Sequence, residues 1–185
     1  MEKKIGLFWL RDDFRVTKNA GLIEATINHE RVIVFYLYKK DSYKNQEAQK
    51  WWLSKSLINF KKKLENLNIN LEIVETNSFK IFFDKLIKKE DFAIYWNKVY
   101  EPEYLKFDNY LINSLKNKNI SHKRLKGNAL NEINEVKKSD GTPFKVFTPF
   151  WRNAEKYYIE KIPFKEKIIK KCKKKINYFK STIQP

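Results

Sequence analysis

A dense cluster of charged side chains of both signs lies between residues 11 and 15, where the chain reads Arg11-Asp-Asp-Phe-Arg15. Two guanidinium groups and two carboxylates within five residues cannot all be buried without partners, because an unpaired buried charge is strongly destabilising. Two compatible interpretations follow. The segment forms a local ion-pair network that pins its own loop, or it shapes one wall of a binding pocket.

Two further groups of side chains could contact a ligand. The first runs from Tyr95 to Pro102, where aromatic rings beside amide and charged groups suit a planar heterocycle. The second is on a helix predicted at residues 47–67: if Leu53 faces the core, Trp51 and Ile58 point to the opposite side. Such an apolar pair indicates a domain interface or a flat aromatic ligand, with packing under a loop as the alternative.

Several kinds of site are excluded by missing residues. The 185 residues include four glycines and neither G-x-G-x-x-G nor G-x-x-x-x-G-K-[ST], which excludes dinucleotide dehydrogenases and P-loop NTPases. G-x-S-x-G is also missing. The single cysteine, Cys172, excludes an internal disulfide and a cysteine-based zinc site. We interpret His29 as a helix-terminal residue and His122 as a strand residue, both structural, and expect no bound metal.

The formal net charge of +17 favours nucleic acid or another polyanion as a partner. Only five of the 39 basic residues are arginines, and the excess of lysine is typical of an AT-rich coding bias, so a solvated lysine surface is the alternative. No run of 18 apolar residues is present, so we expect no membrane contact. Residues 1–5 contain no small-residue cleavage site of a secretory signal, and we expect a cytoplasmic protein.

The elements that position these residues alternate along residues 5–126. Apolar and β-branched runs predict strands, and apolar positions three and four apart predict helices. We expect strands at 5–10, 31–37, 70–75, 92–96 and 120–125, and helices at 18–28, 47–67, 79–87 (capped by Ser78) and 102–118. This order predicts an α/β fold: a Rossmann-like, doubly wound, five-stranded parallel sheet with helices on both faces. Ligands of such sheets bind beyond the carboxyl ends of the strands, where the strand order reverses, so loops 11–19, 38–46 and 97–102 are the candidates.

The last third of the chain changes character. Residues 127–150 are expected to be irregular, and a helix is expected from Pro149 or Phe150 to Glu160. Residues 161–180 contain nine lysines and one acidic residue. We expect this segment to pack on the α/β domain with its lysines solvated outside, and a basic nucleic-acid-binding module is the alternative. Its apolar stripe consists of Ile168, Ile169, Cys172, Ile176 and Phe179.

Four motifs, in order, resemble those of DNA photolyases and cryptochromes. Trp9-Leu-Arg-Asp-Asp-Phe-Arg15 followed by Asn19 resembles W-x-R-x-D-L-R…N, and Trp51-Trp-Leu-Ser-Lys-Ser-Leu57 looks like the second helix of that family. Tyr95-Trp-Asn-Lys-Val-Tyr-Glu-Pro102 is similar to the end of its fourth strand. Gly141-Thr-Pro-Phe-Lys-Val-Phe-Thr-Pro-Phe-Trp151 matches G-x-P-Y-x-V-F-T-P-F nearly residue for residue. Together the motifs cover residues 5 to about 152.

The resemblance implies the N-terminal light-harvesting-pigment (antenna) domain of a deoxyribodipyrimidine photolyase, a carbon–carbon lyase that repairs UV-induced pyrimidine dimers in DNA with light, or of a cryptochrome-type photoreceptor. It implies an antenna domain at 1–152, then a helix and a lysine-rich interdomain linker at 153–185. In the family a larger helical domain holds FAD and the DNA lesion. The sequence ends at Pro185, where the family's linker runs. We therefore expect the FAD-binding domain to be absent and this chain alone to be inactive, with that domain and UV-damaged DNA as partners of the parent protein.

The resemblance also implies a site for an antenna pigment, with no catalytic residue of repair in this chain. Deazaflavin-using members place an acid and an arginine where this chain has Val99 and about Gln49, which favours methenyltetrahydrofolate over a deazaflavin or a second flavin. A stand-alone nucleotide-binding or signalling α/β domain is a further alternative, although the glycine-rich phosphate loop that it needs is missing. The implied lining of the pigment site is Arg11, Asp12, Tyr38, Lys40, Trp51, Asn97, Lys98, Tyr100 and Glu101.

Overall fold

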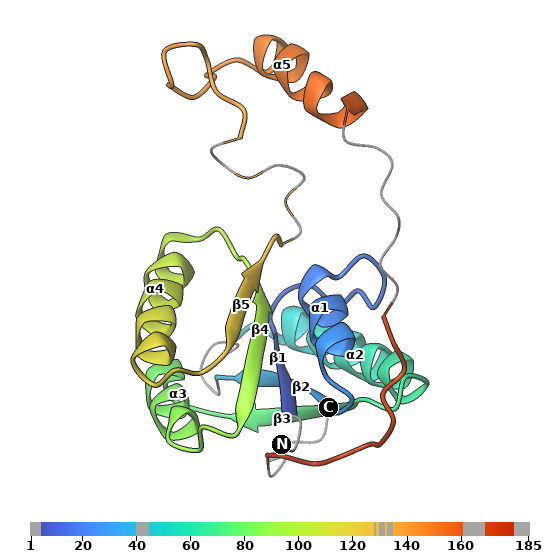
Figure 1. The fold of residues 1–185 in the computed structure, drawn as a ribbon. Coiled ribbons are helices and arrows are strands. Elements are labelled where there is room, and N and C mark those ends of the chain that lie inside the picture. The colour runs from blue at the N-terminus through green and yellow to red at the C-terminus, as the bar shows by residue number, and fades with distance from the viewer. Residues whose placement is uncertain are drawn as a thin grey trace. The chain divides into compact units, whose positions relative to one another are not determined.

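Strands and helices alternate along the chain as expected (Figure 1). In this computed structural model the described residues are 5–39, 45–127, 129, 132, 135–160 and 169–179, without the side chains of 157–160. None of the described helices is long and apolar enough to cross a membrane. The elements are β1 (Ile5–Leu10), α1 (Ala20–Asn28), β2 (Val32–Tyr38), α2 (Glu47–Glu65), β3 (Asn70–Glu75), α3 (Phe79–Ile87), β4 (Phe92–Asn97), α4 (Pro102–Asn117), β5 (His122–Leu125) and α5 (Phe147–Glu160).

The five strands form one parallel sheet in the order β3-β2-β1-β4-β5. The chain first builds outward from β1 through β2 to β3, and then returns to the other side of β1 for β4 and β5. The strand order therefore reverses between β1 and β4, and Trp9 is paired with Trp96 there. The predicted doubly wound, five-stranded parallel sheet is confirmed, and its switch point is the edge shared by β1 and β4.

Helices cover both faces of the sheet, as predicted. Successive side chains of a strand point to opposite faces, so each strand contributes to two cores. Phe8 packs with Leu22 on the face covered by α1 and α2. Trp9 packs with Phe83 and Leu111 on the face covered by α3 and α4. Because both faces are buried, the central strands β1, β2 and β4 are apolar along most of their length, whereas the edge strand β5 has a single apolar residue, Leu125.

Three helices begin or end at least two residues away from the positions predicted from the sequence. The first helix begins two residues later than Lys18, since Lys18 has a φ of 55° and Asn19 is the N-cap. The second helix ends at Glu65 rather than Leu67, ahead of a turn in which Asn68 has a φ of 57°. The fifth helix begins earlier than expected, at Phe147, so Pro149 lies in its first turn, where a missing N–H removes no helical hydrogen bond.

Contacts divide the chain into two compact units, residues 1–127 with 168–185, and residues 128–167. In the first unit, the segment 169–179 returns to the sheet without forming a helix or strand. Cys172 joins the core cluster beside α1 and α2, whereas Phe179 packs on the opposite face of the sheet. The predicted packing of the apolar stripe is confirmed for its described members, and Ile168 lies outside the described residues. The second unit contains α5.

Candidate functional site

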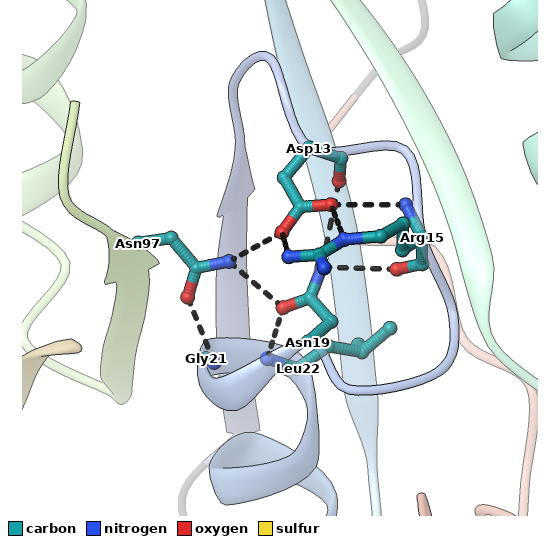
Figure 2. A network of polar contacts seen from close by, with 6 residues as sticks. All are labelled: Asp13, Arg15, Asn19, Gly21, Leu22 and Asn97. Carbon is teal, nitrogen blue, oxygen red and sulfur yellow. Dashed lines mark hydrogen bonds and ion pairs between the residues drawn. The ribbon is translucent and has the colours of Figure 1, made fainter. Parts of the chain in front are cut away.

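Asn97, the last residue of β4, connects the switch point to the start of α1 (Figure 2). Its Oδ1 accepts a hydrogen bond from the Gly21 N–H at 2.8 Å, and its Nδ2 donates to Asn19 Oδ1 at 3.0 Å. Asn19 Oδ1 also accepts from the Leu22 N–H at 3.1 Å. The first N–H groups of a helix have no partner within the helix, so two asparagines share the capping of α1.

Gly21 permits this close approach. A Cβ atom at this position would lie 2.6 Å from Asn97 Oδ1 and 2.6 Å from the Phe8 ring. Any larger residue would therefore push β4 and α1 apart or displace the asparagine. The glycine serves close packing at the switch point, and it is not part of a phosphate-binding loop.

Asp13 and Arg15 form the local ion-pair network that the sequence predicted for this loop (Figure 2). Arg15 Nε and Nη2 each donate to a different oxygen of Asp13 at 2.7 Å. This hydrogen bonding raises the pKa of the Arg15 guanidinium. Asn19 Nδ2 donates to the Arg15 carbonyl at 3.0 Å, and Asn97 Nδ2 lies 3.5 Å from Asp13 Oδ2. The loop is thus held by its own side chains and by β4.

Arg11 turns away from this network into the protein. It is 6% exposed, and it forms an ion pair with the buried carboxylate of Asp108 on α4. Its guanidinium carbon lies 3.9 Å from the centroid of the Trp9 ring. Burial lowers the pKa of Arg11, and the hydrogen bond and charge of Asp108 oppose that shift. Arg124 of β5 also lies 3.4 Å from Asp108, so this carboxylate joins β1, α4 and β5.

Asp12 and Glu101 are exposed beside these buried groups. Neither carboxylate forms a hydrogen bond or ion pair within the described part of the chain, although the Glu101 backbone carbonyl accepts a hydrogen bond from the Leu105 N–H at 3.0 Å. Partial burial by neighbouring atoms raises the pKa of Asp12, the Glu101 carboxylate raises it further, and the Arg11 guanidinium lowers it. The two carboxylates therefore form an acidic rim at the ends of β1 and β4, suited to a ligand that presents N–H donors.

Trp51, in the first turns of α2, is 64% exposed. The helix buries Leu53, Leu57, Phe60 and Leu64 instead, and Ile58 is only half-buried. The prediction that Trp51 and Ile58 lie outside the sheet-packing core is confirmed. The neighbouring Trp52 is 57% exposed, and its ring packs edge-on against Phe14 at 6.0 Å between centroids, whereas the ring of Trp51 contacts, among the described residues, only the Lys55 ammonium at 5.9 Å. Trp51 thus offers a flat ring to a ligand or another domain.

The remaining residues that the family resemblance implies for the pigment site are Tyr38, Lys40, Lys98 and Tyr100. Tyr38, Lys98 and Tyr100 are half-buried near the carboxyl ends of β2 and β4, and the Lys98 N–H donates to the Leu125 carbonyl at 2.8 Å. Lys40 lies outside the described residues. The structure therefore gathers Arg11, Asp12 and the 97–101 segment at one switch point, and Arg11 and Asn97 make internal contacts there. Among the described residues, no group of three or more His, Cys, Asp or Glu side chains could hold a metal ion.

Sequence reasoning missed Asp108, which the switch point needs as the partner of Arg11. A signal was present in the sequence. Asp108 precedes Leu111 and Leu115 by three and seven residues, so an acidic residue occupies the apolar face of α4. A carboxylate at such a position requires a buried cation.

Residues 6–167 match the family model described as DNA photolyase. The chain belongs to the DNA photolyase family. A deoxyribodipyrimidine photo-lyase of Agrobacterium fabrum is 28% identical over 149 residues, covering 80% of this chain and 31% of that protein. Cryptochrome-2 of Arabidopsis thaliana is 26% identical over 167 residues, covering 88% of this chain and 27% of that protein.

The fold agrees with this assignment to the photolyase family. A crystal structure of a bacterial class III photolyase from Agrobacterium tumefaciens is similar with a TM-score of 0.76 at 24% sequence identity, covering 98% of this chain and 38% of that chain. The chain thus spans roughly a third of the length of these photolyases and cryptochromes. It corresponds to the N-terminal α/β domain of the family, as its motifs predicted.

Proposed function

We propose that this chain is the light-harvesting-pigment domain of a deoxyribodipyrimidine photolyase. The observation that carries the proposal is the family match, which runs from β1 through α5. Light-driven cleavage of pyrimidine dimers, the FAD cofactor and the contact with UV-damaged DNA are proposed for the whole protein, in the cytoplasm. Within it, residues 1–152 form the pigment domain, and residues 153–185 link it to a flavin-binding domain.

The pigment proposed is methenyltetrahydrofolate. Its pterin ring is flat, so it can stack on the exposed indole of Trp51. A pterin edge carries N–H donors, and the unpaired carboxylates of Asp12 and Glu101 are acceptors for such donors. Partial burial and, after it, repulsion from Glu101 raise the pKa of Asp12, and a donor bound there would offset both effects. Val99 and Gln49 stand where deazaflavin-using relatives are expected to place an acid and an arginine, so a deazaflavin fits less well.

A bound pigment would supply light absorption and the transfer of excitation energy to the flavin. The residues of this chain would hold it in place. Asn97 and Arg11 fix the two loops to the sheet, and Asp12 and Glu101 accept hydrogen bonds from the edge of the ring. Because energy transfer depends on the distance and orientation of the pigment, a rigid support at the switch point serves the function directly.

The proposal is tested by titrating the 185-residue chain with methenyltetrahydrofolate and following the absorption and fluorescence of the pigment. We expect saturable binding that is tighter than that of FAD or a deazaflavin. Trp51→Ala should weaken binding about tenfold, since stacking on an aromatic ring contributes roughly 1 kcal/mol or more. Trp52→Ala is the matched control, because Trp52 packs on Phe14, and it should leave the affinity within about twofold. Equal losses in the two variants, or tighter binding of FAD, would refute the pigment assignment.

A cryptochrome-type photoreceptor is the second candidate, and the similarity to cryptochrome-2 favours it. A photolyase and a photoreceptor share the same kind of pigment domain, and they differ in whether light leads to the repair of pyrimidine dimers. The protein with its flavin domain, incubated in light with oligonucleotides that contain pyrimidine dimers, should remove the dimers if it is a photolyase. Flavin photoreduction without loss of dimers would identify a photoreceptor.

A further inference from the structure

The segment 169–175 is fixed against the turn that follows α2 (Figure 1, red). The Cys172 N–H donates to the Leu67 carbonyl at 2.9 Å, and Asn68 Nδ2 donates to the Cys172 carbonyl at 3.0 Å. The side chain of Cys172 is 3% exposed and lies in the core beside α2. Two stretches about a hundred residues apart in the sequence therefore form one continuous surface.

Because Cys172 points inward, the lysines around it point outward, and those of the segment are exposed. On α2, Lys61 and Lys62 lie four and three residues before Glu65, which places them on the same side of the helix. Lys175 Nζ lies 3.9 Å from Glu65, so the two groups of lysines meet. We call this surface the basic face. It comprises Lys61, Lys62, Lys170, Lys171, Lys173, Lys174 and Lys175.

Few carboxylates neutralise the basic face. Glu30 pairs with Lys173 at 2.9 Å, and Glu65 lies near Lys175. Exposed pairs of this kind contribute less than about 1 kcal/mol, so an incoming anion can displace them. The other lysines of the face form no ion pair with any described residue. In contrast, Lys80 and Lys123 elsewhere on this unit are paired with acids.

We propose that the basic face binds the phosphate backbone of duplex DNA without reading its sequence. Ammonium groups neutralise phosphates as point charges, but they lack the fork of arginine that reads guanine. The apolar side chains of this segment, Ile169 and Ile176, pack inward, so no described side chain of the face could enter a bilayer. Phe179 packs on Phe35 and is not available to stack on unpaired bases.

The basic face lies at the opposite end of the sheet from the pigment site. The segment contacts Thr26 near the end of α1 and Glu30 just before β2, through hydrogen bonds from the Lys170 and Lys173 N–H groups. These positions precede the amino ends of the strands, whereas Asp12 and Glu101 follow the carboxyl ends. DNA bound to the basic face would leave the pigment site open. This contact is independent of the pigment and of lesion recognition.

The test is a titration of the 185-residue chain with a fluorescent 20-base-pair duplex by anisotropy, between 50 and 200 mM salt. The seven lysines of the basic face exceed its two neighbouring carboxylates, Glu30 and Glu65, by about five charges. If all of this excess charge neutralises DNA phosphates, the slope of log K against log salt is about −4 to −5. Replacing Lys170, Lys171 and Lys174 by Gln should reduce the slope by about two to three and raise Kd more than about tenfold at 50 mM salt. The matched control removes the same charge from exposed lysines on α3 and α4, with Gln at Lys85, Lys106 and Lys116.

We expect the control variant to keep the slope and to change Kd less than about threefold. Equal effects of the two variants would show that total charge, and not this face, drives binding, and would overturn the proposal. So would an unchanged slope in the basic-face variant. Tighter binding of a single strand with the same number of phosphates, or binding of anionic phosphatidylserine vesicles without binding of duplex, would likewise overturn it. A folate titration is unaffected in either case, so this result is separate from that of the pigment assignment.

Discussion

The substitution Asn97→Ala tests whether the junction of β4 and α1 holds the candidate site together. It removes the acceptor of the Gly21 N–H and the donor to Asn19 Oδ1. Asn97 is 5% exposed, so water has little access to the groups left behind. The backbone of Ala is compatible with a strand, and the main effect is therefore the loss of these polar contacts.

The expected loss of stability follows from those contacts. A buried N–H without an acceptor costs about 1–3 kcal/mol, and the second hydrogen bond contributes about 1 kcal/mol. Asn19 Oδ1 keeps its bond from the Leu22 N–H, and the contact of Asn97 with Asp13 at 3.5 Å is too long to add much. We therefore expect the free energy of unfolding to fall by about 2–4 kcal/mol.

Urea unfolding followed by circular dichroism measures this change, with an unchanged m-value as the sign of a purely native-state effect. Asn109→Ala on α4 is the control, because Asn109 is exposed and Ala has the higher helix propensity, so its effect should stay below about 0.7 kcal/mol. A loss below 1 kcal/mol for Asn97→Ala, or an equal loss for the control, would refute the view that Asn97 caps α1 across the switch point.

Two other substitutions distinguish a residue that stabilises the fold from a residue that is proposed to bind the pigment. Arg11→Met should destabilise the protein by about 3 kcal/mol or more by urea unfolding, because Asp108 stays buried with only Arg124 near it. Asp12→Asn should raise the free energy of unfolding at pH 7 by less than about 1 kcal/mol, since the raised pKa means that ionised Asp12 opposes folding. That gain should vanish below the pKa of an unfolded aspartate, where the acid is protonated in both states, and the same variant should bind methenyltetrahydrofolate more weakly.

The sheet could be predicted from the sequence because its central strands, β1, β2 and β4, are buried on both faces. A continuous apolar run such as Ile5–Leu10 has an unambiguous beginning and end, and β1 and β3 have the predicted bounds. Helix ends were harder to predict. A positive φ at Lys18 has no signature in the residue type, since lysine rarely adopts it, and the true N-cap is the asparagine that follows.

The candidate site could be located from the sequence, but the role of each side chain could not. The strand pattern placed Arg11 and Asn97 at the same switch point. It did not reveal that Arg11 pairs with Asp108, 97 residues away, because such pairing depends on tertiary packing. The loop was predicted as a local ion-pair network, and Asp13 and Arg15 form one, whereas the neighbouring Arg11 does not join it.

The charged residues that follow β1 point in different directions, and this decides which of them can report on pigment binding. Around the turn after β1, Arg11 faces the core, Asp12 faces solvent, and Asp13 faces its own loop. The charged groups with the strongest partners hold the fold, so replacing them lowers stability before any loss of binding can be measured. Asp12 forms no ion pair in the described structure, Trp51 contacts only the Lys55 ammonium there, 5.9 Å from the centroid of its ring, and both side chains remain exposed. A loss of binding at those two positions without a loss of stability would therefore report on the pigment contact itself.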